Sequence, residues 1–298
     1  MKRSYLPILG LSATILASAG FTAHLAGTAA EPVRIAGGQF EASGVVHVPS
    51  SRTVLFVDDG RVREVFALEV NADGSQRGDS RSVSLQAEIT DPEGITTDGN
   101  LFYVVGSQSK KTGFDGDGLV RFAFDAATGQ ADRIERIQGL KNWLLDHVAE
   151  LRGAKGLNIE GLAWDPVNQR LLMGLRAPVV DGQALILPLR FKDVAGPFTI
   201  DNLIVEGGKA IRVPLDGAGI RSMEYDETAS AFRIIAEAGV TPASRDFRIV
   251  EWRSGDQSVR EVARFASRLK PEGVTRVILD GRPRTLVVFD TSRVTTID

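Results

Sequence analysis

A short motif returns five times along the chain and constrains the fold more than any other feature. Its glycines are Gly44, Gly94, Gly161, Gly219 and Gly273, so successive copies are 50, 67, 58 and 54 residues apart. Steps of roughly 40 to 50 residues or slightly more are typical of propeller blades with four strands each. The repeat therefore predicts an all-β chain folded as a β-propeller. Five four-stranded blades fit best, and six are the alternative if the longest step hides a degenerate unit.

Each copy continues through a polar turn into an apolar strand, and the middle copies show two further strands. In the third copy these are 184–191 and an outer strand over 203–213. The apolar segments that follow the motif cover 54–57, 101–105, 171–175, 232–236 and 286–289. The last copy is short, and residues 33–36 are expected to supply its missing outer strand, which closes the ring and leaves no open sheet edge. A β-sandwich or two smaller β domains would give no reason for the motif to return at near-equal spacing.

The longest step contains an insertion with helical periodicity. Its apolar residues recur at i, i+3, i+4, i+8 and i+11, namely Leu140, Trp143, Leu144, Val148 and Leu151. This spacing predicts one short amphipathic helix near 140–152, with Gly153 as its C-terminal cap.

The first 30 residues have the pattern of a cleavable signal peptide. Lys2 and Arg3 precede a mostly apolar stretch, and small residues end it before Glu31. An uncleaved membrane anchor is the alternative. Residues 31–298 then form a single domain, periplasmic or secreted and expected to be a monomer without a further membrane span. Cleavage removes two positive charges and no acid, so the net charge changes from −3 to −5. This balance argues against nucleic acid as a partner.

The repeat also predicts a site, because the innermost strand of each blade lines the central channel. The residues at the start of these strands are Ser43, Glu93, Glu160 and Glu272, with Arg221 close by in the fourth copy. The second strands end in polar residues as well: Asp58 and Asp59, Ser107, Arg176, Glu237 and Asp290. We expect carboxylates and arginines from several blades to converge at one mouth of the channel.

Three glutamates around one channel repel each other unless a positive charge compensates. One hypothesis is a metal site formed by Glu93, Glu160 and Glu272, with calcium as the cation that suits oxygen ligands. The alternative is internal pairing of these carboxylates with Arg176, Arg221 or Lys155. Candidate contacts to a charged ligand are Arg176, Arg221, Lys155, Asn158, Asp58 and Asp290.

Familiar catalytic motifs are absent from the sequence. There is no G-x-S-x-G elbow, H-E-x-x-H, P-loop or Rossmann glycine set, and the chain contains no cysteine. His47 follows the first copy of the motif, either as a base facing the channel or as an ordinary strand residue. The segment 115–118, Asp-Gly-Asp-Gly, resembles part of a calcium loop but lacks its later ligands, which favours a turn.

Several segments resemble a bacterial family known as domain of unknown function 3616. The resemblance rests on 91–95, 105–110, 154–163, 174–178, 184–186, 219–221 and 271–274, which follow in the expected order through nearly the whole of 31–298. It implies a propeller-like domain without an agreed activity. Gln108 stands where the family more often has histidine, which argues against a histidine-based mechanism at that loop. A more distant similarity links the Glu-Gly motif to phytase-type, esterase-like propellers.

Two functions therefore compete at this point. The first is a non-catalytic module that binds a metal ion, a small charged ligand or a partner protein at the channel mouth. The second is a calcium-dependent ester or phosphoester hydrolase, in which the glutamates hold the metal and the cationic residues hold the substrate. A purely structural or protein-interaction propeller, with its glutamates and arginines paired internally, is the third alternative.

Overall fold

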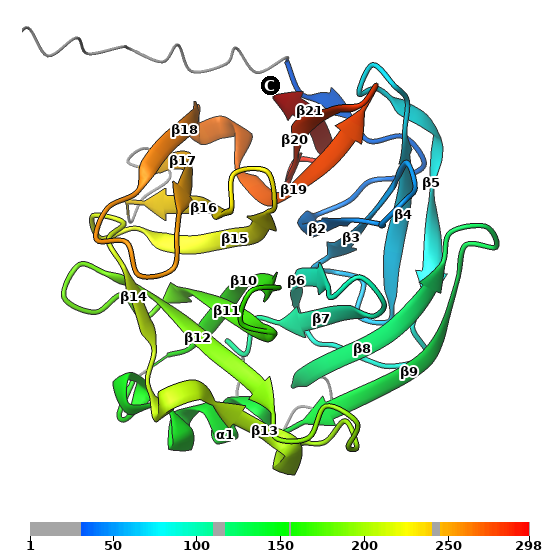
Figure 1. Cartoon of the computed structure of the whole chain (residues 1–298). Helices are drawn as coiled ribbons and strands as arrows, with labels where there is room; N and C mark the ends of the chain where they lie inside the picture. Colours follow the sequence, from blue (N-terminus) through cyan, green and yellow to red (C-terminus); the bar gives the residue numbers. More distant parts are fainter. Residues whose placement is uncertain (1–30, 110–116, 155, 240–244, 298) are drawn as a thin grey trace, which may run out of the picture.

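The chain forms a ring of five β-sheets around a central axis (Figure 1). The computed structural model describes residues 31–109, 117–154, 156–239 and 245–297. The innermost strands contact each other in a closed circle, in the order β2, β6, β10, β15, β19 and again β2. The predicted five-bladed propeller is confirmed.

Four-stranded antiparallel meanders make up three of the blades. Blade 1 contains β2 (Ala42–His47), β3 (Thr53–Asp58), β4 (Glu64–Val70) and β5 (Gln76–Ser84). Blade 2 contains β6 (Pro92–Thr97), β7 (Phe102–Gly106), β8 (Gly118–Asp125) and β9 (Gln130–Gln138). Blade 4 contains β15 (Gly219–Asp226), β16 (Ala231–Ala238), β17 (Asp246–Trp252) and β18 (Arg260–Phe265).

Blade 3 departs from this scheme at its outer edge. It contains β10 (Asn158–Asp165), β11 (Arg170–Ala177) and β12 (Ala184–Phe191). The segment expected to form one outer strand is instead two short strands, β13 (Leu203–Val205) and β14 (Ile211–Val213), which both pair with β12. A 3-10 turn over Glu206–Gly208 separates them, and Gly207 has a positive φ of 69° there, which an extended strand does not accommodate.

Blade 5 joins the two ends of the domain. It contains β19 (Pro271–Leu279), β20 (Arg282–Phe289), β21 (Arg293–Ile297) and, as its outer strand, β1 (Val33–Arg34). Val33 lies opposite Val294 in this antiparallel pair. The expected closure is confirmed, and it ties the segment after residue 31 to the C-terminal strands.

The predicted helix lies between blades 2 and 3 and is shorter than its periodicity suggested. α1 covers Leu140–His147, and a separate 3-10 turn over Ala149–Leu151 follows it. Val148, in an extended conformation, is the C-terminal cap of α1, and Arg152 is that of the later turn, so the prediction of Gly153 as the helix cap is wrong. Leu140 and Leu144 are fully buried and fill the wider space between these two blades.

Each pair of neighbouring blades shares its own hydrophobic core. The five clusters of buried side chains lie between blades 1 and 2, 2 and 3, 3 and 4, 4 and 5, and 5 and 1. Fully buried aromatic residues mark several of them, including Phe56, Phe122, Trp252 and Phe289. Since burial of such a side chain contributes about 1.5–3 kcal/mol, the blade interfaces supply most of the stabilising area.

The motif glycines lie where the inner strands of adjacent blades approach most closely. A Cβ atom on Gly44 would lie 2.6 Å from the carbonyl oxygen of Glu93, and one on Gly273 would lie 2.3 Å from that of Ser43. Gly94 and Gly161 face the inner strand of the next blade in the same way, at 2.7 Å from Leu162 and 2.8 Å from Ile220. The glycine is therefore a packing requirement of the ring.

We expect Gly273→Ala to destabilise the protein by about 1–3 kcal/mol, because the added methyl group overlaps backbone atoms of the adjacent blade. Urea unfolding followed by circular dichroism measures this loss. Gly156→Ala is the matched control: no atom lies within 4 Å of its added Cβ, so its stability should be unchanged or about 0.5 kcal/mol higher. Equal stabilities of the two variants would contradict the packing role of Gly273.

Candidate functional site

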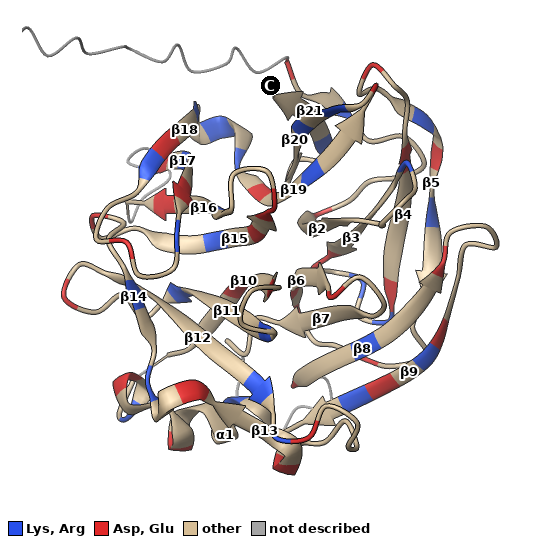
Figure 2. Ribbon diagram, viewed as in Figure 1, with Lys and Arg blue, Asp and Glu red and all other residues tan. Residues whose placement is uncertain are grey.

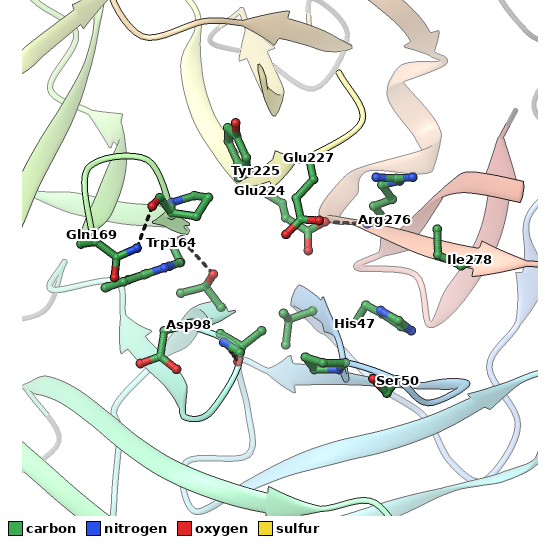
Figure 3. Close-up of a pocket in the computed structure, with 16 residues that line it drawn as sticks. His47, Ser50, Asp98, Trp164, Gln169, Glu224, Tyr225, Glu227, Arg276 and Ile278 are labelled. Atoms are coloured by element: carbon green, nitrogen blue, oxygen red, sulfur yellow. Dashed lines mark hydrogen bonds between the residues drawn. The ribbon is translucent and has the colours of Figure 1, made fainter. Parts of the chain in front are cut away.

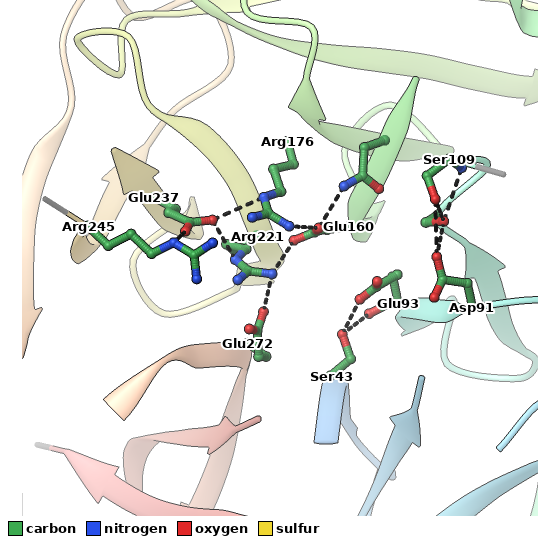
Figure 4. A network of polar contacts seen from close by, with 12 residues as sticks. Ser43, Asp91, Glu93, Ser109, Glu160, Arg176, Arg221, Glu237, Arg245 and Glu272 are labelled. Carbon is green, nitrogen blue, oxygen red and sulfur yellow. Dashed lines mark hydrogen bonds and ion pairs between the residues drawn. The ribbon is translucent and has the colours of Figure 1, made fainter. Parts of the chain in front are cut away.

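A β-bulge places one residue of each inner strand at the same end of the channel. The register between inner and second strands shifts between Pro92 and Gly94, Ile159 and Gly161, Ile220 and Ser222, Pro271 and Gly273, and Ala42 and Val45. The residues left out of register are Glu93, Glu160, Arg221 and Glu272, and Ser43 with Gly44 in blade 1. Bulges re-aim side chains in this way. Figure 4 shows the side chains of five of these residues directed toward one another: Ser43, Glu93, Glu160, Arg221 and Glu272.

This register corrects the alignment of the fourth copy. By residue type the sequence predicts Gly219 as the motif glycine of this copy, with Arg221 close by. The structure instead aligns Ser222 with the other glycines and Arg221 with the glutamates. Serine is accommodated there because its Oγ accepts a hydrogen bond from the backbone N–H of Val274 at 3.2 Å.

We call this end of the channel the charged mouth and define it by the five residues above together with Arg176, Glu237 and Arg245. Figure 2 shows acidic and basic residues side by side at the inner ends of the strands there. Arg221 is its central cation. It forms ion pairs of 2.9 Å with Glu160, 2.8 Å with Glu237 and 2.8 Å with Glu272.

Two further arginines extend this network toward the surface. Arg176 forms ion pairs with Glu160 at 2.9 Å and with Glu237 at 3.1 Å, and Arg245 pairs with Glu237 at 2.9 Å. Asn158 donates a hydrogen bond from Nδ2 to Glu160 at 2.9 Å. Arg176, Arg221 and Asn158, all predicted as site residues, are thus brought together around Glu160.

Burial and charge act against each other in this network. Burial disfavours the charge on Arg221, but Glu160, Glu272 and Glu237 outweigh it and raise the pKa of the guanidinium above its usual value. Burial raises the pKa of Glu272 well above its ordinary value, although Arg221 opposes the rise. The mouth is therefore an internally compensated set of charges rather than an exposed acidic ring.

Glu93 differs from the other two motif glutamates because no arginine forms an ion pair with it among the described residues. It accepts a hydrogen bond of 2.7 Å from the hydroxyl of Ser43. Burial raises the pKa of Glu93 to about 8, and the nearby carboxylate of Glu160 adds to the rise. Asp59, also on this side of the mouth, has its pKa raised to about 7 by burial and by Glu41.

The remaining predicted ligand contacts are less central. Asp58 accepts hydrogen bonds from the backbone N–H groups of Gly60 at 3.0 Å and Glu41 at 3.2 Å, so it holds a turn. Asp290 pairs with Lys270 at 2.5 Å. Lys155, residues 110–116 with half of the proposed calcium-loop fragment, and residues 1–30 lie outside the described residues.

The motif glutamates were predicted either to hold a metal ion or to pair with cationic side chains, and the structure bears on both hypotheses. Glu160 and Glu272 both pair with Arg221, as the alternative proposed. Among residues 31–109, 117–154, 156–239 and 245–297, no group of three or more acidic or histidine side chains is arranged to hold a metal ion. Calcium at Glu93, Glu160 and Glu272 stays a prediction.

His47 does not belong to the charged mouth. It stands at the far end of β2, where its Nε2 lies 2.9 Å from the carbonyl oxygen of Ser51. Burial lowers the pKa of its imidazole, so the ring is neutral at pH 7. Because a carbonyl only accepts, Nε2 carries the proton.

Sequence reasoning missed Arg245 and Lys270 as site residues. Both lie just outside the two strands that the repeat describes: Arg245 precedes β17, and Lys270 precedes β19. Their only signal in the sequence is a positive charge next to a strand terminus at the same end of a blade.

Fold and site together define a five-bladed β-propeller whose channel carries a network of paired arginines and glutamates at one end. The chain belongs to the family described as a protein of unknown function, DUF3616, whose model matches residues 140–294. The resemblance noted in the sequence is confirmed for this family. No curated protein matches the chain, and the similarity to phytase-type propellers stays a prediction.

Solved structures with a similar fold include three sugar dehydrogenases. The soluble aldose sugar dehydrogenase of Escherichia coli is 10% identical with a TM-score of 0.46, covering 89% of this chain and 98% of its own. The PQQ domain of pyranose dehydrogenase from Coprinopsis cinerea is 10% identical with a TM-score of 0.48, covering 90% and 95%. A putative glucose dehydrogenase of Thermus thermophilus is 13% identical with a TM-score of 0.45, covering 90% and 99%. These matches assign neither a ligand nor a reaction to this chain.

No helix within the described ranges is long and apolar enough to cross a membrane.

We expect Arg221→Met to destabilise the protein by about 3–5 kcal/mol, because it leaves buried carboxylates without their shared cation. Arg63→Gln is the control, since it breaks an ion pair of the same length, 2.8 Å, that is exposed to solvent. That change should cost less than about 1 kcal/mol. Urea unfolding at pH 7 measures both, and an Arg221→Met variant as stable as Arg63→Gln would contradict the central role of Arg221.

Glu93 should make stability depend on pH. Its pKa is about 8 in the folded protein against an ordinary 4.5. Between these values the folded state binds more protons than the unfolded state, so this contribution is lost as the pH rises from 4.5 through 8. Glu93→Gln should therefore gain stability relative to the wild type as the pH increases from 5 to 8, measured by urea unfolding. Asp132→Asn changes an exposed position on β9, so its free energy of unfolding should vary with pH as that of the wild type does. The same parallel dependence in Glu93→Gln would contradict the raised pKa of Glu93.

Proposed function

We propose that this protein binds a small anionic ligand, one that carries a carboxylate or phosphate group, at the charged mouth through Arg176 and Arg245. The observation that carries the proposal is that both guanidinium groups are anchored on the same buried carboxylate, Glu237, yet remain partly exposed. The exposed fractions of the side chains are 32% for Arg176 and 25% for Arg245, against 8% for Arg221.

The two arginines play a different part from Arg221. Arg221 is surrounded by three carboxylates and compensates their charge. Arg176 and Arg245 use Nε toward Glu237, at 3.1 and 2.9 Å, and Nε is the guanidinium nitrogen nearest the backbone. Arg176 also pairs through one terminal nitrogen with Glu160, at 2.9 Å. A ligand can therefore reach the other terminal nitrogen of Arg176 and the terminal nitrogens of Arg245 from the mouth.

Anchoring by Glu237 and Glu160 prepares these side chains for binding. A free arginine loses conformational entropy when it closes on a ligand, whereas one held by an ion pair has already lost most of it. Planar guanidinium groups also match the paired oxygens of carboxylates and phosphates. The buried glutamates therefore act as positioning residues, and the arginines are the expected contacts.

The charge balance of the mouth is compatible with one more negative group. Arg176, Arg221 and Arg245 match Glu160, Glu237 and Glu272 in number, and burial, which raises the pKa of Glu272, lowers the negative charge further. Glu93 is mostly protonated at pH 7 because its pKa is about 8. A ligand carboxylate or phosphate bound at Arg176 and Arg245 would thus meet little repulsion from Glu93.

Thermal unfolding in the presence of inorganic phosphate, acetate or succinate, at constant ionic strength set with sodium chloride, tests the proposal. A ligand at about a hundred times its dissociation constant should add roughly 2.7 kcal/mol to the free energy of unfolding. Arg176→Gln and Arg245→Gln should each abolish most of this gain, since each removes one of the two contacts. Arg63→Gln, on the outer surface of the ring, should keep it.

Two results would overturn the proposal. One is the absence of any saturable stabilisation across these anions, which would make the charged mouth a purely structural network. The other is stabilisation that both variants retain, which would place the anion elsewhere.

A further inference from the structure

The end of the channel opposite the charged mouth contains a cavity of about 400 Å³. Its wall includes the fourth residue after the bulge position in every blade: His47, Thr97, Trp164, Tyr225 and Arg276. Four residues of strand correspond to about 13 Å, so this cavity, the axial pocket, is separate from the charged mouth. Figure 3 shows side chains of the five blades surrounding it.

The axial pocket has an excess of negative charge. Asp98, Glu224 and Glu227 line it, and Arg276 is the one cation among its lining residues. Arg276 is already paired at 3.1 Å with Asp226, which is buried beneath it. His47 adds no charge, because burial lowers its pKa.

The carboxyl groups of Glu224 and Glu227 differ in protonation and in exposure. Burial raises the pKa of Glu224 to about 8, and this group accepts hydrogen bonds from the hydroxyl of Thr275 at 2.8 Å and the backbone N–H of Arg276 at 2.6 Å. Glu224 is therefore mostly neutral at pH 7. Glu227 is exposed at the rim and forms no ion pair within the described ranges. It is the carboxylate most available to a ligand.

Two aromatic residues complete the wall, and both are held in place by other rings. Trp164 stacks parallel to Tyr103, with ring centroids 6.4 Å apart and 4° between the planes. Tyr225 packs edge-on against Phe232 at 5.1 Å. They come from neighbouring inner strands, β10 and β15, and line the same pocket as Glu227.

From this geometry we propose that the axial pocket binds a small organic cation, an alkylammonium group. Aromatic rings attract such cations through their negative faces, and a nearby carboxylate supplies the countercharge. An anion would meet Asp98 and Glu227 and would have only Arg276, which already pairs with Asp226. A bare metal ion has no suitable set of three or more ligands among the described residues.

Isothermal titration calorimetry of the whole protein with tetramethylammonium chloride tests the proposal. tert-Butanol is the matched neutral probe, since it has a similar size and shape without the charge. Glucose and sodium acetate represent neutral hydroxyl-rich ligands and anions. We expect saturable binding of tetramethylammonium and at least tenfold weaker binding of the other three.

Variants assign the site to this pocket. Glu227→Gln removes an exposed charge without disturbing packing and should weaken binding of tetramethylammonium about three- to tenfold, as should Tyr225→Leu. Asp132→Asn, the exposed control on blade 2, should leave the affinity unchanged. Arg245→Gln, which alters only the charged mouth, should also leave it unchanged.

The proposal is overturned if tetramethylammonium does not bind, or if tert-butanol or glucose binds as tightly. Unchanged affinity in Glu227→Gln would likewise overturn it, provided that the melting temperature shows the variant to be folded. Because Glu227 is exposed, we expect Glu227→Gln to remain folded even if Tyr225→Leu destabilises the inner strand.

Discussion

The close approach of neighbouring inner strands is the constraint on which the rest of the structure depends. Four glycines and one serine leave room for the next strand, and a methyl group added at any of these glycines would lie less than 3 Å from its neighbours. This packing forces the inner strands into one circle, with the motif positions of the five blades at the same height along the channel. The bulge that precedes each glycine then brings five side chains to the same height. Side chains from segments more than 200 residues apart in sequence meet there without any long loop.

The charged mouth is costly for a fold of this kind, because several ionised groups are removed from water. Buried ion pairs contribute little net stability compared with well-packed apolar side chains. The hydrophobic clusters between blades, not the arginines and glutamates, therefore hold the ring together. What the network gives in return is a fixed position for Arg176 and Arg245. A chain that needed only stability would be served as well by apolar residues at Glu160, Arg221 and Glu272.

The sequence allowed most of the fold to be predicted. The repeat favours five blades over six, and the last copy lacks the outer strand that residues 33–36 were expected to supply. The predictions made from the sequence were wrong where the local residue pattern and the tertiary contacts differ. Gly219 matched the motif by residue type, but register, which depends on pairing with β16, places Ser222 in that role. The outer edge of blade 3 was predicted as one strand because apolar residues flank Glu206–Gly208 on both sides. The site was half predictable: positions on the repeat, such as Glu160 and Arg176, were found, whereas Arg245 lies on no repeated element.

The two ends of the channel show how one repeat supports different chemistry. The position of the motif glycine must hold a small residue in every blade, so it preserves the architecture and gives no information about ligands. The bulge residue just before it and the residue four positions after the bulge are free of that requirement, because they line the two ends of the channel. At the first level the blades supply serine, arginine and three glutamates, which compensate one another. At the second they supply histidine, threonine, tryptophan, tyrosine and arginine, five different side chains around one cavity. Uniform residues would indicate a structural layer, and the variety at the second level is what a pocket shaped for one ligand requires.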